Sequence, residues 1–146
     1  MPDEFAVLIP ASGTGVRIEL FNGGHALLAR RVAGEHARPV DIDLEPVVLV
    51  NASVYQPDEH RSADLYLWYA ANGLELGHPY NERATALAWH EGRSSTRIYG
   101  DAVITDEYVG RGELHGSNLI RALRASDLIP GAVAALDASR GGFDGQ

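Results

Sequence analysis

The first half of the chain carries short runs of apolar residues separated by polar and glycine-rich segments, a pattern typical of β-strands. Residues 5–9 and 16–20 are rich in apolar and β-branched side chains. The segment 11–15 between them holds small residues and two glycines, which suit a turn. The pattern therefore predicts a β-hairpin.

The next two apolar runs differ in their periodicity. In residues 26–32, Leu28 and Val32 lie four apart on one helical face, and Gly34 is placed to end a short helix. Residues 46–55 are apolar at successive positions over their first half. Because a central strand is covered on both faces, this run predicts a central strand.

Turn signals surround the following strand. The segment 56–62 is polar and predicts an exposed loop, and residues 63–70, rich in Leu, Tyr and Trp, predict a strand. Asn72 and Gly73 form a dipeptide typical of tight hairpins and lead to a short apolar run over 74–76. We therefore expect a second hairpin.

A helix is predicted to begin at Asn81, whose side chain can accept a hydrogen bond from the backbone of the first turn. Pro79 disfavours helix before it, and Glu82 lies near the positive end of the helix dipole. After this helix, residues 97–105 have the alternating pattern of another strand.

The last third of the chain is predicted to be helical. A glycine-punctuated connection over 109–116 precedes Ser117, which can cap an amphipathic helix over 118–124. Pro130 is expected to open a last short helix through Ala138. We therefore predict an α+β fold with a mainly antiparallel sheet of about five to six strands, on which three to four short helices pack. Residues 1–139 are expected to form one domain and residues 140–146 a frayed tail.

Composition narrows the chemistry. The 146 residues include no cysteine, and all twelve basic residues are arginine, which excludes thiolate and Schiff-base catalysis. The net charge of −8 has no basic cluster to oppose it, so we expect no binding to duplex nucleic acid. The acidic start of the chain and the lack of a long apolar run predict a cytoplasmic protein with no membrane contact.

Metal and cofactor sites are not predicted. The six histidines show no spacing that would bring two ligands onto one helix or strand. Asp58, Glu59 and His60 could join His78, but a solvated charged loop is the preferred interpretation of these residues. We expect no metal and no cofactor.

Two groups of residues remain as site candidates. Glu107, Glu113 and His115 lie in or beside the glycine-bearing segment and form the best available acid–base set for an enzyme.

The helix that begins at Asn81 is the preferred ligand-binding candidate. Its free backbone N–H groups, with Arg83 in the first turn and Tyr80 just before it, suit an anionic ligand. Arg121 and Arg124 on the later helix could add positive charge. The structural alternative is that Asn81 caps the helix, Tyr80 packs on it and Arg83 pairs with a surface acid.

Two resemblances bear on function. The pattern Asn81-x-x-Ala84-Thr85-x-Leu87, followed by Ile98-x-Gly100-Asp101-x-Val103, resembles a family of small phage and actinobacterial proteins with a domain of unknown function. The family has no assigned catalytic residue. The stretch 108–116 is similar to a segment of antirestriction proteins that mimic DNA, although the helix after it carries arginines where a mimic would carry acids.

We therefore expect a non-catalytic binding protein of phage or mobile-element type, which binds a small nucleotide-like anion or occludes a host protein, in counter-defence. A small acid–base enzyme acting on a nucleotide-like substrate is the main alternative. An acidic antirestriction-type protein that competes with DNA is the other. A homo-oligomer is left open.

Overall fold

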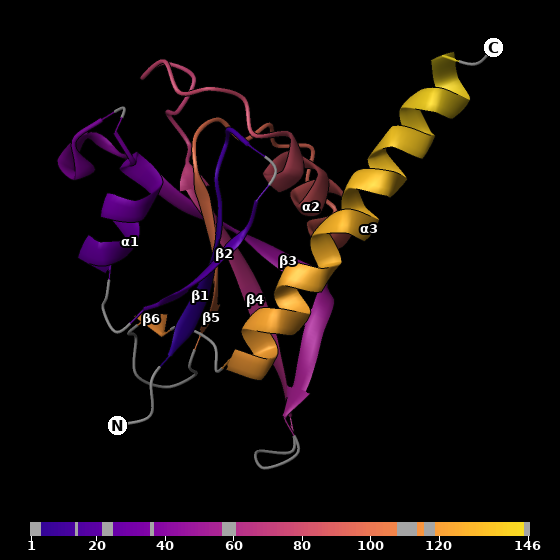
Figure 1. Cartoon of the computed structure of the whole chain (residues 1–146), viewed down its shortest axis with the longest axis horizontal. Helices are drawn as coiled ribbons and strands as arrows, with labels where there is room; N and C mark the ends of the chain where they lie inside the picture. Colours follow the sequence, from indigo (N-terminus) through magenta and orange to yellow (C-terminus); the bar gives the residue numbers. More distant parts are fainter. Residues whose placement is uncertain are drawn as a thin grey trace.

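The computed structural model describes residues 4–13, 15–21, 25–35, 37–56, 61–107, 114–115 and 119–144. It contains an antiparallel sheet, three α-helices and one short 3-10 helix, so the predicted α+β class is confirmed (Figure 1). The strands are β1 (Phe5–Ile9), β2 (Arg17–Leu20), β3 (Leu44–Gln56), β4 (Arg61–Ala70), β5 (Ala102–Glu107) and β6 (Leu114–His115). The helices are α1 (His25–Ala33), η1 (Pro39–Asp41), α2 (Glu82–Gly92) and α3 (Leu119–Asp144).

The sheet has the strand order β2-β1-β5-β4-β3, and β6 adds to the far end of β5. The hairpin predicted from the first two apolar runs is β1–β2, with Leu8 opposite Arg17. The long hairpin is β3–β4. Of the segment 56–62 predicted to be a loop, Gln56, Arg61 and Ser62 belong to the two strands, and residues 57–60 lie outside the described residues. β5 then inserts between β1 and β4, which brings the two hairpins into one sheet.

Helices cover both faces of the sheet. In β1, Ala6 and Leu8 face one way and pack with Leu28 and Val32 of α1. The alternate residues of β1 face the other way and pack with α2 and α3. Figure 1 shows α1 on one side of the sheet and α2 and α3 on the other, so the fold has three layers. Among the described residues, none of the helices combines the length and apolar character needed to cross a bilayer.

Two strand predictions were wrong in position. The strand predicted as central, β3, lies at the edge of the sheet. Its apolar run reflects the two helical layers, since Val47 and Leu49 pack in the cluster under α2 and Leu44 packs in the cluster under α1. The strand predicted over 97–105 begins only at Ala102, and the residues before it form an irregular connection.

The hairpin predicted at Asn72–Gly73 does not form. Residues 71–77 make consecutive turns that lead toward α2, not a strand. The Asn72 side chain instead ties this turn to η1, because its Nδ2 donates to the Asp41 carbonyl and its Oδ1 accepts from the Asp43 amide. At Gly73 an added Cβ would lie 2.4 Å from the carbonyl oxygen of Tyr99, so this glycine permits a close backbone approach.

The two helices predicted on either side of Pro130 are one helix, α3, with the proline inside it. A proline in a helix removes one backbone hydrogen bond and usually breaks or kinks the helix. Here Ala125, Ile129 and Ala132 are buried on both sides of it, so packing holds the helix together across the proline. The segment expected to fray over 140–146 is helical as far as Asp144.

Candidate functional site

The predicted cap residue Asn81 is buried, at 1% exposure, and uses its whole amide inside the chain. Its Oδ1 accepts a hydrogen bond from the amide of Ala84 at 3.0 Å, which confirms the cap. Its Nδ2 donates to the carbonyls of Ile9 and Gly100, both at 2.9 Å. Asn81 therefore joins α2 to the end of β1 and to the connection before β5, and it has no hydrogen-bonding group left for a ligand.

The residues beside the cap also make internal contacts. Tyr80 packs on Tyr99 with ring centroids 5.5 Å apart. The Arg83 guanidinium donates to the carbonyl of Gly15 at 2.6 Å and to that of Pro10 at 2.8 Å, which braces the β1–β2 turn. Burial lowers the pKa of Arg83 below its ordinary value. Of the structural alternative, the cap at Asn81 is confirmed. Tyr80 instead packs on Tyr99 before β5, and Arg83 binds two carbonyls in place of a surface acid.

The two arginines predicted on the later helix have separate surroundings. Arg121 forms an ion pair with Asp106, whose carboxylate is almost fully buried. Arg124 is exposed on the outer side of α3. Arg83 lines a pocket with Ser126 and Asp127 of α3, and neither Arg121 nor Arg124 is among the lining residues of that pocket.

The acid–base candidates meet only in part. Glu107 ends β5 and pairs with Leu114, and His115 pairs with Asp106 in the next register position. The backbones of Glu107 and His115 are therefore neighbours across the β5–β6 ladder, whereas Glu113 lies outside the described residues.

Of the metal candidates only His78 lies within the described residues, among which no three potential ligand side chains cluster. His78 is buried, and an added Cβ at Gly100 would lie 2.3 Å from its Nδ1. The imidazole therefore packs directly on the Gly100 backbone. Asp58, Glu59 and His60 lie outside the described residues.

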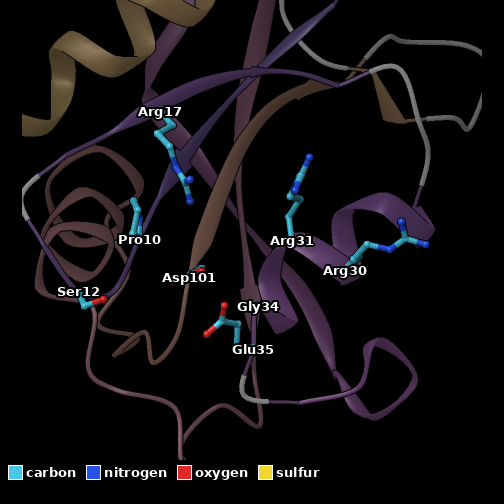
Figure 2. Close-up of a pocket in the computed structure, with 8 residues that line it drawn as sticks. All are labelled: Pro10, Ser12, Arg17, Arg30, Arg31, Gly34, Glu35 and Asp101. Atoms are coloured by element: carbon cyan, nitrogen blue, oxygen red, sulfur yellow. The ribbon is translucent and has the colours of Figure 1, made fainter.

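A pocket with several arginines lies on the other face of the sheet, between α1 and the β1–β2 hairpin (Figure 2). Its volume is about 450 Å³. We call it the arginine pocket; it is lined by Pro10, Ser12, Arg17, Arg30, Arg31, Gly34, Glu35 and Asp101. None of these residues was predicted to bind a ligand.

The arginines reach this pocket from two elements. Arg17 begins β2, and Arg30 and Arg31 lie in the last turn of α1, where positive charge also favours the helix dipole. The amide of Gly34 donates to the carbonyl of Arg30 at 3.2 Å, and its φ of +56° lets the chain turn away from α1. The helix thus ends at the pocket rim with its basic residues beside the hairpin.

Asp101 forms the floor of the pocket next to Gly34. One of its carboxylate oxygens accepts a hydrogen bond from the amide of Ala11 at 2.9 Å. The other lies 3.2 Å from the place where a Cβ of Gly34 would stand, so glycine leaves room for the carboxylate. Gly100, with φ of +94°, turns the chain so that Asp101 follows the corner fixed by Asn81. The Gly100-Asp101 motif therefore connects the α2 corner to this pocket.

Glu19 holds two of the arginines close to each other. Its carboxylate oxygens lie 3.7 Å from the Nε of Arg17 and 3.1 Å from the Nε of Arg31. In each ion pair the arginine approaches Glu19 through its Nε. Each Nη amino group can donate to a further oxygen atom.

The side chains of the pocket present both signs of charge. Figure 2 shows Arg17 and Glu35 extending toward the middle of the pocket near Asp101, while Arg30 points away from it. Guanidinium groups bind phosphate or carboxylate oxygens, and the carboxylates of Glu35 and Asp101 can accept hydrogen bonds from hydroxyl or amino groups. The arrangement therefore suits an anion that also carries donors.

Only weak sequence signals pointed to this pocket. The sequence contains the Arg30-Arg31 pair and the Gly100-Asp101 motif as local features. It does not show that Arg17 and Arg31 line one pocket, because the packing of α1 on the sheet brings them there. Comparison of the chain with protein-family models, with curated proteins and with solved structures finds no match. The resemblance to phage and actinobacterial proteins therefore stays a prediction.

Proposed function

We propose that this chain is a small non-catalytic binding protein whose arginine pocket holds a nucleotide-like anion. The observation that supports the proposal is that Arg17 and Arg31, from different elements, both pair with Glu19 at the edge of the pocket. An anionic group of the ligand, such as a phosphate, would bind the Nη groups of these two arginines, and Arg30 would turn inward to join them.

The acidic side of the pocket supports a ligand with hydroxyl groups. Glu35 and Asp101 line the pocket opposite the arginines. A ribose presents vicinal hydroxyls that donate well to carboxylates, as dinucleotide-binding proteins show. A plain anion would meet repulsion from these two acids, so we expect a nucleoside phosphate to bind more tightly than inorganic phosphate.

The biological setting of this proposal rests on the sequence resemblance. We infer a phage or mobile-element protein that sequesters a nucleotide-like ligand in the cytoplasm of its host, in counter-defence. The small-enzyme alternative predicts conversion of the ligand, which the same binding experiment would reveal as new products.

Calorimetric titration of the protein with adenosine monophosphate and with inorganic phosphate tests the proposal. We expect saturable binding of the nucleotide, and a loss of at least about tenfold in affinity for Arg17→Ala and for Arg31→Ala, since a hydrogen bond to a charged group contributes about 1.5 to 3 kcal/mol.

Arg38→Ala is the matched control. Arg38 also pairs through Nε with a carboxylate, that of Asp41 at 3.0 Å, but it lies outside the pocket. Its loss should leave the affinity unchanged. If all three substitutions lowered the affinity equally, the nucleotide would be attracted by net charge alone. If the wild type did not bind the nucleotide, the proposed function would be wrong.

A further inference from the structure

Helix α3 exposes large apolar side chains on its outer side. Its inner side is buried through Ala122, Ala125 and Ile129. On the opposite side, Ile120 is 65% exposed and Leu123 is 48% exposed, and both lie near the start of the helix. Two large apolar residues on one helical face are typical of a surface that is covered by a partner.

The same side of α3 carries two small exposed residues further along the helix. Gly131 and Ala134 are exposed there, and an added Cβ at Gly131 would meet no atom within 4 Å. Glycine inside a helix lowers helix stability, and here neither a positive φ nor a close contact among the described residues requires it. Close packing of another chain against α3 would explain why a glycine occupies this position.

Two opposite charges lie between the apolar and the small residues. Arg124 and Asp127 are both exposed on α3, three residues apart, and Asp127 also lines a pocket with Val16 and Arg83. From the start of the helix, this side therefore presents apolar, positively charged, negatively charged and small side chains in that order. This order is self-complementary: an antiparallel copy of the helix presents small against apolar and negative against positive.

We propose that α3 pairs with α3 of a second copy of this chain, antiparallel about a twofold axis near Ser126. In this register Arg124 lies opposite Asp127 of the second copy, and the twofold axis repeats that ion pair. The same register places Ile120 opposite Gly131, where the missing side chain leaves room for it. Ile120 of each helix thus occupies the space beside Gly131 of the other. This pairing does not depend on the ligand proposed for the arginine pocket, which lies on the opposite face of the sheet (Figure 1).

The charges make the proposal testable by exchange. Arg124→Asp alone, or Asp127→Arg alone, places like charges opposite each other in the homodimer. The double variant restores two attractive pairs, and an equimolar mixture of the two single variants restores them in a heterodimer. Only an antiparallel twofold pairing in this register makes all four results hold together.

Sedimentation velocity of the full chain at increasing concentration measures the effect. We expect the wild type and the double variant to form dimers, each single variant to dissociate with a constant at least about tenfold higher, and their mixture to associate again. Asp137→Arg is the control, because Asp137 is exposed on α3 but lies beyond the paired charges. Circular dichroism checks that each variant folds.

A wild type that stays monomeric at all concentrations would overturn the proposal. So would a dimer that both single variants and the double variant weaken alike, because that result would place the interface elsewhere or in another register. A dimer that Asp137→Arg weakens as strongly as Arg124→Asp would also contradict it.

Discussion

The buried amide of Asn81 should stabilise this fold far more than an ordinary helix cap. Asn81→Ala removes one acceptor and two donors, and it leaves the amide of Ala84 and the carbonyls of Ile9 and Gly100 without this partner. Loss of a cap costs about 1 kcal/mol, and a buried backbone group that loses its hydrogen bond costs roughly 1 to 3 kcal/mol. Because a carbonyl oxygen can accept a second hydrogen bond, we expect each carbonyl to cost about 1 kcal/mol, the lower end of this range. The predicted loss in unfolding free energy is therefore about 3 kcal/mol.

Urea denaturation followed by tryptophan fluorescence provides the measurement, because Trp68 is buried and Trp89 is half-exposed. Asn51→Ala is the matched control: the exposed Asn51 makes a single hydrogen bond, from Nδ2 to the carbonyl of His90. That change should cost less than about 1 kcal/mol. If Asn81→Ala cost no more than Asn51→Ala, the amide would act neither as a cap nor as the joint between α2 and β1.

Three further changes test other parts of the structure. Gly131→Ala should raise the unfolding free energy of the dilute chain by about 0.5 to 1 kcal/mol, because its Cβ meets open space, and a lower urea midpoint would contradict this. Burial raises the pKa of the Tyr69 phenol, and a hydrogen bond from Thr96 opposes this effect. The titration of this phenol should therefore leave the unfolding free energy unchanged below about pH 10 and lower it as the pH rises from there through the folded pKa. Tyr69→Phe should flatten that decline in a series of urea curves, and an unchanged slope would refute the assignment. Arg121→Ala removes the ion-pair partner of the buried Asp106 and should cost about 3 kcal/mol; a loss below about 1 kcal/mol would mean that other groups stabilise the carboxylate.

Local patterns in the sequence were sufficient for much of the fold. The β1–β2 hairpin, α1 and the cap at Asn81 depend on residues close together in the chain, and each was predicted. The errors arose where distant contacts override local preference. Asn72 is held by the backbone of η1 instead of forming a hairpin, and Pro130 stays inside α3 because buried residues flank it.

The candidate site was less accessible to sequence reasoning. Arg83 was selected because it lies at a helix start, but its donors are taken by two carbonyls of the β1–β2 turn, and no local pattern shows such contacts. Arg17 and Arg31 belong to different elements, and only the packing of α1 on the sheet lets Glu19 contact both. The motif that contains Asp101 lies at a turn of the chain. The position of Asp101 in the pocket depends on the close approach of Gly34.

A nuclear magnetic resonance titration tests whether the arginine pocket binds a nucleotide-like anion. The side-chain Nε–H signals of the arginines are followed as adenosine monophosphate is added. We predict saturable shifts for Arg17 and Arg31, with smaller shifts for Arg30 and none for Arg38, which lies outside the pocket. Shifts centred on Arg83, or no shifts at saturating nucleotide, would contradict the account.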